Sequence, residues 1–169
     1  NLIYVDKENG GKSDALNAGI NASSYPLFAC LDADSRLERD SLLRLGNEFI
    51  KDTTTVVAGG LVRIANGGVI KDGIFESYNL PEKAIERFQT VEYFRSFLAG
   101  RTSWGVTNSM LIVSGAFGVF KKQVVIDVGG YKTDTIGEDM EIVVRIHEYM
   151  LRNKLKYKVK FVEQAICWT

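Results

Sequence analysis

The sequence has few of the residues that form zinc centres, disulfide frameworks or histidine-dependent hydrolytic sites. Among its 169 residues are two cysteines and one histidine. Cys30 and Cys167 lie far apart without Cys-x-x-Cys spacing, which argues against a zinc site and a disulfide framework. Each lies in an apolar run and is expected to be a buried thiol in a reducing compartment. Because His147 is the single histidine and no Gly-x-Ser-x-Gly segment occurs, a Ser-His-Asp hydrolase is disfavoured, and we expect His147 to be a packing or surface residue.

An excess of charge of one sign is also missing. The chain has 21 basic Lys and Arg residues and 21 acidic Asp and Glu residues. Binding driven by nucleic-acid phosphates requires an excess of basic residues, so we expect no nucleic-acid partner. No apolar run reaches the roughly 18–20 residues of a membrane-spanning helix. The length and the hydrophobic fraction of 46% are ordinary for one folded domain with a substantial core.

Short apolar segments alternate with amphipathic segments along the chain, which predicts an α/β layered domain. We expect strands over residues 2–5, 26–31, 54–64 (interrupted by Gly59-Gly60), 111–120 and 157–169. The last of these alternates lysines with apolar residues, as an exposed strand does. We expect helices from Ser13, over the segment containing Leu42 to Phe49, over 75–97, and from Asp139 to Met150. Residues 100–110 lack periodicity and are expected to form a loop.

Asp32-Ala33-Asp34, directly after an apolar strand, is the sharpest chemical signal in the sequence. On an extended segment alternate side chains share a face, so the two carboxylates would project together at a strand end, where open α/β sheets bind ligands. Converging carboxylates repel unless protons or a cation compensate, and Mg²⁺ or Mn²⁺ held together with substrate phosphates meets that need. The alternative is a solvated strand-to-helix turn, in which Asp34 or Ser35 is a helix cap.

Two glycine-containing segments precede predicted helices. Lys7-Glu8-Asn9-Gly10-Gly11-Lys12 combines exposed backbone N–H groups with flanking lysines, which suits an anion, although P-loop spacing is absent and a flexible charged turn explains it equally well. In Gly137-Glu138-Asp139, a carboxylate could act as a general base on an acceptor hydroxyl, or could be a first-turn acid that the helix dipole favours.

Aromatic residues are concentrated in the middle of the chain. Their rings could stack on a sugar or a base, or could belong to the core or to an interface. These residues are Phe88, Tyr93, Phe94, Phe97 and Trp104.

A set of motifs in fixed order is more specific than any one of them. The set comprises Lys7-x-Asn9-Gly10-Gly11-Lys12-x-x-Ala15-Leu16-Asn17-x-Gly19, Asp32-Ala33-Asp34-Ser35, Ser114-Gly115-Ala116-Phe117-Gly118 and Gly137-Glu138-Asp139. It resembles the family 2 glycosyltransferases, and within them the processive membrane synthases of cellulose, hyaluronan and poly-N-acetylglucosamine. The resemblance covers nearly the whole chain.

The resemblance implies a GT-A fold, with three α/β/α layers around a mixed sheet. It also implies a nucleotide-diphospho-sugar donor (UDP-GlcNAc or another UDP-hexose), a divalent Mg²⁺ or Mn²⁺, and inversion at the anomeric carbon. The acceptor would be a polysaccharide or a lipid-linked glycan. The implied roles are donor binding for Asn9, Gly10, Gly11, Lys12, Asp32 and Asp34, metal binding for Asp32 and Asp34, an acceptor-site lining for Ser114, Gly115 and Ala116, and base catalysis by Asp139 with Glu138 beside it.

Two departures from the family pattern shape the expectations for this chain. The family's first strands would precede residue 1, and its Gln-x-x-Arg-Trp motif and membrane helices would follow residue 169. Residues 1–5 read as the middle of a strand rather than as a signal peptide. We therefore expect residues 1–169 to be one partial glycosyltransferase domain of a longer protein at the cytoplasmic face of a membrane, soluble by itself and of little or no activity. Without partner strands, residues 2–5 would be displaced, swapped into a neighbouring copy or paired non-natively.

Three other functions are alternatives to this one. A non-processive family 2 transferase could act on a lipid or a short glycan. A catalytically silent nucleotide-sugar-binding module is less consistent with the intact acids Asp32, Asp34 and Asp139. A nucleotidyltransferase is disfavoured because no Gly-rich, Arg/Lys-containing signature is visible near residue 1.

Overall fold

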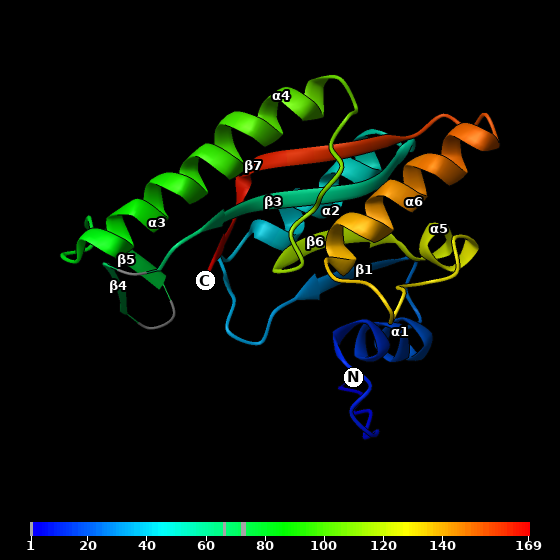
Figure 1. Cartoon of the computed structure of the whole chain (residues 1–169), viewed down its shortest axis with the longest axis horizontal. Helices are drawn as coiled ribbons and strands as arrows, with labels where there is room; N and C mark the ends of the chain where they lie inside the picture. Colours follow the sequence, from blue (N-terminus) through cyan, green and yellow to red (C-terminus); the bar gives the residue numbers. More distant parts are fainter. Residues whose placement is uncertain (1, 66, 72–73) are drawn as a thin grey trace.

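The centre of the molecule is a five-stranded mixed sheet (Figure 1). A computed structural model describes residues 2–65, 67–71 and 74–169. The strand order is β1-β6-β3-β7-β2, and β3 and β7 are parallel whereas the other neighbouring pairs are antiparallel. The strands are β1 (Leu27–Leu31), β2 (Arg36–Leu37), β3 (Thr55–Arg63), β6 (Phe117–Lys121) and β7 (Lys158–Trp168). A separate two-stranded antiparallel sheet consists of β4 (Gly68–Lys71) and β5 (Ile74–Tyr78).

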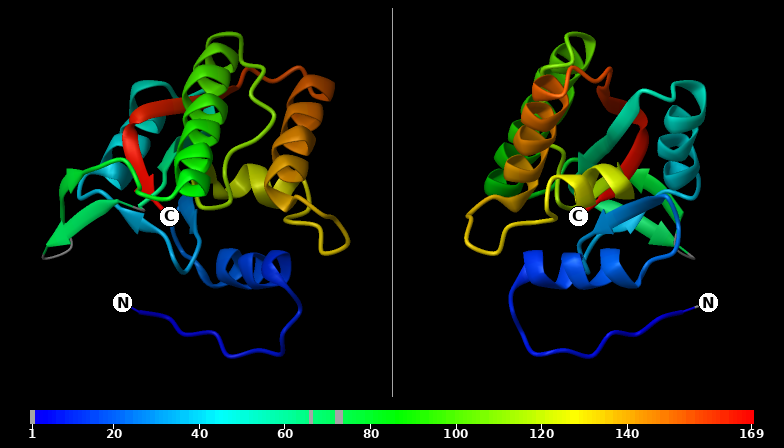
Figure 2. Two further views of the ribbon diagram at one scale, coloured as in Figure 1. Left: turned by 60° about the vertical axis from the view of Figure 1, so that its left-hand side comes forward. Right: turned by 90° about the vertical axis from the view of Figure 1, so that its right-hand side faces the viewer.

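Helices cover both faces of the five-stranded sheet (Figure 2). Helix α2 (Ser41–Lys51) packs on one face, and α6 (Glu138–Arg152) lies on the other. On the same face as α6 lies a long helix that comprises α3 (Ala84–Phe94), the π-helical segment η1 (Arg95–Gly100) and α4 (Arg101–Val106). The remaining helices are α1 (Lys12–Ala22), which lies below β1 in Figure 1, and α5 (Lys122–Asp127). None of the helices in the described part of the chain has the length and apolar character that a bilayer crossing requires.

Side-chain alternation along the central strands divides the core into two parts. Val57 and its neighbours on one face pack with Ile142 and Ile146 of α6, all three with no measurable exposure. Ala58, one position along β3, faces the opposite cluster around Leu45 of α2. Because both faces of the sheet are covered, its strands are apolar over most of their length, as the sequence indicated. These layers confirm the α/β class predicted from the alternation of segments.

The expected strand over residues 2–5 is wrong. Residues 2–11 adopt neither helix nor strand, and Leu2 and Tyr4 are 97% and 85% exposed. This segment lies beyond α1, away from the five-stranded sheet (Figure 2). It is therefore a displaced segment in this structure, which is the first of the three arrangements expected for it.

Two expectations for the middle of the chain need correction. The segment 75–97 begins as β5 and becomes helical only at Ala84, and the expected loop over 100–110 contains α4. Gly105 lies in α4 against β7, where a Cβ on it would make an ordinary contact with Cβ of Phe161 at 3.6 Å. Tertiary packing of a helix against the sheet thus overrides the low helix propensity of glycine.

Strand β7 was expected to be an exposed strand, but it lies inside the sheet between β3 and β2. Its alternating lysines pair with acidic residues instead of facing only solvent. Lys158 Nζ lies 2.9 Å from Asp52 Oδ2, and Lys160 Nζ lies 3.0 Å from Glu48 Oε2 at the end of α2. Val159 on the other face is 1% exposed.

The glycines of β3 and α2 lead to a prediction about stability. A Cβ on Gly46, in the middle of α2, would have no atom within 4 Å, so Gly46→Ala adds helix propensity without a clash. We expect the free energy of unfolding to rise by about 0.5–1 kcal/mol, measured by denaturant titration. A Cβ on Gly60 would instead meet the Phe117 ring and lie 2.6 Å from the carbonyl oxygen of Ala165. Gly60→Ala is therefore the opposite control and should destabilise the fold by about 1–3 kcal/mol.

Candidate active site

Lys12, the first residue of α1, joins acidic side chains from two distant parts of the chain. Its Nζ lies 2.7 Å from Asp32 Oδ1 and 3.2 Å from Glu138 Oε1. Partial burial opposes the charge on the ammonium group, but the hydrogen bonds to Asp32 and Glu138 outweigh it and raise the pKa of Lys12. The ammonium group therefore stays charged at neutral pH, and its ion pairs are lost only as the pH rises through that raised value. The glycine-lysine segment, the Asp-x-Asp segment and the Gly-Glu-Asp segment thus meet at one point.

The Asp32-Ala33-Asp34 segment forms a tight turn rather than an extension of β1. The strand ends at Leu31, and the N–H of Ser35 donates to the carbonyl of Asp32 at 3.0 Å. The expectation that the two carboxylates alternate on an extended segment is therefore wrong, because the chain reverses here to enter β2. The alternative of a cap is also wrong, since α2 begins at Ser41 and neither Asp34 nor Ser35 adjoins it.

The turn provides oxygen donors of the kind that Mg²⁺ and Mn²⁺ prefer. Asp32 is half-buried and Asp34 is exposed, so both carboxylates can be reached from solvent. Within residues 2–65, 67–71 and 74–169, no three or more His, Cys, Asp or Glu side chains form a group that could hold a metal ion. Mg²⁺ with a nucleotide usually takes one or two carboxylates, with phosphate oxygens and water as its other ligands. Metal binding by Asp32 and Asp34 stays a prediction.

A second tight turn, Ser114-Gly115-Ala116, brings a backbone N–H to Asp139. The N–H of Gly115 donates to Asp139 Oδ2 at 3.4 Å, and the N–H of Phe117 donates to the carbonyl of Ser114 at 3.0 Å. Strand β6 begins only at Phe117, so the strand expected over 111–120 is shorter than predicted. Ala116 is 9% exposed and packs in the α2-facing core, which leaves Ser114 and Gly115 as the accessible part of the turn.

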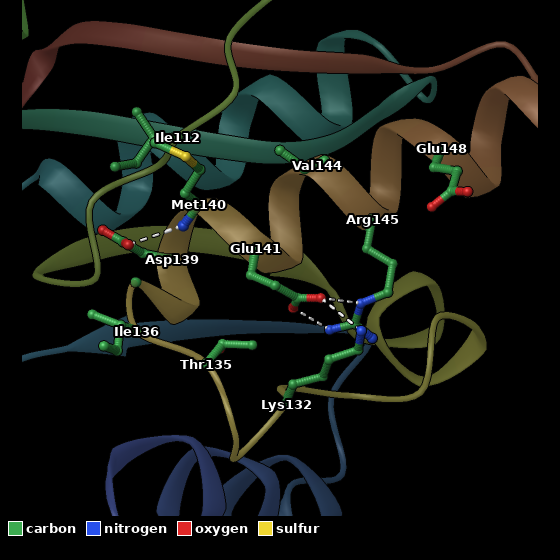
Figure 3. Close-up of a pocket in the computed structure, with 11 residues that line it drawn as sticks. Ile112, Lys132, Thr135, Ile136, Asp139, Met140, Glu141, Val144, Arg145 and Glu148 are labelled. Carbon is green, nitrogen blue, oxygen red and sulfur yellow. Dashed lines mark hydrogen bonds and ion pairs between the residues drawn. The ribbon is translucent and has the colours of Figure 1, made fainter.

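Asp139 lies in the first turn of α6, at one end of an open groove of about 540 Å³ (Figure 3). Its Oδ1 accepts the N–H of Met140 at 2.9 Å. An acidic residue in the first turn of a helix complements the partial positive charge at the helix's amino-terminal end. Glu138 pairs instead with Lys12, so the two adjacent acids have different partners.

A charged cluster of Glu141, Arg145 and Lys132 lies farther along the same groove (Figure 3). The Arg145 guanidinium donates to Glu141 at 2.8 and 2.5 Å, and Lys132 Nζ lies 3.4 Å from Glu141 Oε1. The hydrogen bonds from Arg145 are the main cause that lowers the pKa of Glu141. Arg145 also donates to the carbonyl oxygens of Val128 and Gly130, so it anchors the loop that precedes α6.

The cluster predicts a pH-dependent contribution to stability. Because the pKa of Glu141 is lowered in the folded state, its ion pair contributes fully above the unfolded pKa and is lost as the pH falls through the folded pKa. We expect Glu141→Gln to lower the free energy of unfolding by about 1.5 kcal/mol at pH 7. In denaturant titrations at falling pH, the difference from the unsubstituted chain should disappear once the pH has passed below the lowered pKa of Glu141. Glu148→Gln is the control, because its pair with Arg152 is exposed and should contribute little at any pH.

Two residues near Asp139 were missed by the sequence analysis. Arg101 in α4 is 6% exposed; burial lowers the pKa of its guanidinium to about 10, and the negative charge of Asp139 opposes that change. Arg101 thus remains positive at neutral pH beside the acid. Tyr131 is 5% exposed, its hydroxyl lies 3.4 Å from Cys30 Sγ, and burial raises its pKa. No pattern in the sequence distinguishes Arg101, because its segment resembles a loop.

The expected donor-binding loop is part of an exposed segment at the start of α1. Asn9 Oδ1 accepts the N–H of Gly11 at 3.0 Å, and Gly11 precedes α1 with a φ of 87°. Asp14, in the first turn, forms an ion pair with Lys7, and a Cβ on Gly10 would collide with its carboxylate. Donor binding by Asn9, Gly10 and Gly11 stays a prediction.

His147 and the two cysteines behave as the sequence analysis expected. His147 is buried in the packing of α6, where its Nε2–H donates to the carbonyl of Met110 at 2.9 Å and its Nδ1 accepts the Tyr157 hydroxyl at 2.6 Å. Cys30 and Cys167 are free and buried, and burial raises the pKa of both thiols. The thiols are therefore protonated and unreactive at neutral pH.

The aromatic residues singled out in the sequence lie mainly on the outside of the long helix. Phe88, Phe94 and Trp104 are 73%, 62% and 46% exposed, so these three are not core residues. Tyr93 is half-buried and contacts the α2-facing core. The side chain of Phe97 lies outside the described part of the structure.

Comparison with known sequences identifies the family. Residues 1–129 match the model of Glycosyl transferase family 2. The chain is 33% identical over 168 residues to the poly-beta-1,6-N-acetyl-D-glucosamine synthase of Staphylococcus aureus (strain COL), and 31% identical over 166 residues to that of Staphylococcus epidermidis. These alignments cover 99% and 98% of this chain but 36% and 35% of the relatives, so the chain spans about a third of their length.

Comparison with solved structures identifies the fold. The mannosyltransferase PcManGT from Pyrobaculum calidifontis, in complex with GDP-Man and Mn²⁺, is similar with a TM-score of 0.59 and 18% identity, over 97% of this chain and 37% of that one. GalNAc-T7, with UDP, GalNAc and Mn²⁺, gives a TM-score of 0.60 and 14% identity, over 96% and 31% of the two chains. The GT-A fold implied by the motifs is thus confirmed. With its ordered motifs, its fold and the match over most of its length, the chain belongs to glycosyltransferase family 2.

Proposed function

We propose that this chain is the core of a catalytic domain that transfers N-acetylglucosamine from UDP-GlcNAc to a growing polysaccharide, with inversion at the anomeric carbon. The whole enzyme would be a longer, membrane-associated protein. The observation that carries the proposal is the meeting of Lys12, Asp32 and Glu138 next to Asp139. The 33% identity to a polysaccharide synthase over 99% of the chain supports the choice of sugar and product.

The donor side of the proposed site consists of Lys12 and the turn at Asp32–Asp34. The Lys12 ammonium would approach the donor diphosphate, since it is charged, partly exposed and held by only flexible side-chain contacts. A Mg²⁺ or Mn²⁺ ion bound by Asp32 and Asp34 would neutralise charge on the departing diphosphate. The presence of Mn²⁺ with both similar structures supports the use of a divalent cation.

The acceptor side consists of Asp139 and the Ser114–Gly115 turn. The Gly115 N–H would orient the Asp139 carboxylate through Oδ2. The carboxylate would take the proton of an acceptor hydroxyl while its oxygen bonds to the anomeric carbon and the bond from that carbon to the diphosphate breaks. Attack from the face opposite the leaving UDP inverts the anomeric configuration.

The proposal is tested by incubating the full-length protein with a panel of UDP- and GDP-sugars, with Mn²⁺ or Mg²⁺, and measuring nucleotide release and product length. We expect UDP release and polymer from UDP-GlcNAc alone, lost with EDTA and restored by the cation. A product of one or a few added sugars would instead identify a non-processive transferase. UDP binding without release from any donor would identify a silent binding module and overturn the proposal.

A further inference from the structure

The side chain of Asn17, one and a half turns into α1 from Lys12, binds both backbone groups of one distant residue. Asn17 Oδ1 accepts the N–H of Tyr131 at 2.8 Å, and Asn17 Nδ2 donates to the carbonyl of Tyr131 at 2.7 Å. Two such bonds to a single residue fix both its position and its orientation, as in a strand pair. The neighbouring Gly130 has a φ of 74°, and a Cβ there would lie 2.7 Å from Asn17 Oδ1, so the contact is close-packed.

Tyr131 begins the loop that leads into Asp139, and the other polar contacts described for this loop, from Arg145 and Lys132, connect it to α6 itself. Gly129 and Gly137, near its two ends, both have a φ of 88°, a backbone conformation that glycine adopts readily. Ile136, two residues before α6, is fully exposed. The loop descends from α6 to α1 in Figure 3, so its position depends on what holds it at the α1 end.

The anchors of this loop differ in what they can fix. Arg145 binds the carbonyl of Gly130, but it belongs to α6, the same helix as Asp139. The contact from Arg145 holds the loop to α6, but it does not fix the position of the loop and α6 relative to Lys12 and Asp32. Asn17 belongs to α1, whose first residue Lys12 contacts Asp32. Its bonds to Tyr131 therefore connect the helix that begins with Lys12 to the segment that carries Asp139.

The Tyr131 side chain reinforces the same connection. Its hydroxyl lies 3.4 Å from Sγ of Cys30, which is two residues before Asp32, and its ring packs edge-on against Phe120 at 6.4 Å between centroids. Elements α1, β1 and the loop before α6 thus converge on one buried residue.

We propose that Asn17 is a positioning residue for sugar transfer, which sets the place of the Asp139 carboxylate relative to the Lys12–Asp32 pair through the backbone of Tyr131. The inference rests on the proposed function, in which Lys12 and Asp32 bind the donor and Asp139 activates the acceptor. A displacement of about 1 Å between such groups costs rate rather than binding, because the donor contacts themselves are unchanged.

The test is Asn17→Asp in the full-length protein, with Asn153→Asp as the matched control. The carboxylate can still accept the N–H of Tyr131 but has no proton for its carbonyl, so the second bond becomes a repulsion. Asn153 makes the same kind of bond, Nδ2 to the carbonyl of Tyr149 at 2.8 Å, at the exposed end of α6. We expect Asn17→Asp to lower kcat about 30-fold with less than a threefold change in the donor KM. Asn153→Asp should change neither.

Amide hydrogen exchange provides a readout that does not depend on turnover. We expect exchange in residues 131–140 to accelerate about tenfold in Asn17→Asp and in the uncharged Asn17→Ser, with the rest of α6 unchanged. Unchanged exchange and kcat in both variants, or a fall in kcat without faster exchange, would overturn the role of Asn17. If the unsubstituted protein transfers no sugar, the proposed function fails, while the exchange data still decide whether Asn17 holds the loop.

Discussion

Replacement of Asp139 by Asn is expected to slow sugar transfer by about a thousandfold and to leave UDP binding within about threefold of its original affinity. The amide has the shape of the carboxylate, and its single oxygen can still accept one of the two N–H groups that Asp139 binds, that of Gly115 or that of Met140. It cannot take the proton of an acceptor hydroxyl, so the loss falls on the chemical step. Rates are measured by UDP release from UDP-GlcNAc, and binding by calorimetry with UDP.

The control for this experiment is Asp127→Asn, an exposed acid in α5 that accepts a hydrogen bond from Gln123 at 2.8 Å. It should change neither rate nor binding. Retention of more than a tenth of the rate in Asp139→Asn would exclude Asp139 as the base and direct attention to Glu138. A parallel loss of UDP binding would place Asp139 on the donor side of the site instead.

The sequence motifs selected residues that the structure brings together, but they did not predict the geometry in which these residues meet. Lys12, Asp32 and Glu138 were selected from separate motifs, but their contact depends on how α1 and α6 pack around β1, which no local pattern encodes. The alternation rule placed Asp32 and Asp34 on one face, whereas the backbone turns there because Ser35 bonds back to Asp32. The alternation of side chains holds only within a strand, and β1 ends at Leu31, before the two acids.

The errors in the predicted secondary structure also arise from contacts between residues that are distant in the sequence. Gly105 signals a loop by composition, yet it lies in α4 and faces Phe161 of β7. Lys158 and Lys160 signal an exposed strand, yet they pair with Asp52 and Glu48 on a strand that lies between β3 and β2. In both cases a partner distant in sequence reverses the local preference, since burial and pairing outweigh propensities of a few tenths of a kcal/mol.

Gly115→Ala is expected to lower the transfer rate by about a hundredfold with a change in the free energy of unfolding below about 1 kcal/mol. Gly115 does not have a positive φ, so alanine suits its backbone. The added Cβ would lie 2.8 Å from Lys12 Nζ and 3.6 Å from Glu138 Oε1. The end of a lysine side chain moves at little cost, so the fold tolerates the methyl group, but the ammonium must leave its place between Asp32 and Glu138.

A double-mutant cycle separates this mechanism from a general disturbance of the turn. If the methyl group acts by displacing Lys12, Gly115→Ala should cost little further rate in a Lys12→Met background, because the group that it displaces is already gone. Gly19→Ala, on the same helix as Lys12, is the control, since a Cβ at Gly19 would have no atom within 4 Å. Additive losses in the double variant would mean that Gly115 acts through its N–H to Asp139 rather than through Lys12. A loss of stability above about 2 kcal/mol would mean that the glycine is needed by the fold, and the rate would then carry no information about the ammonium group.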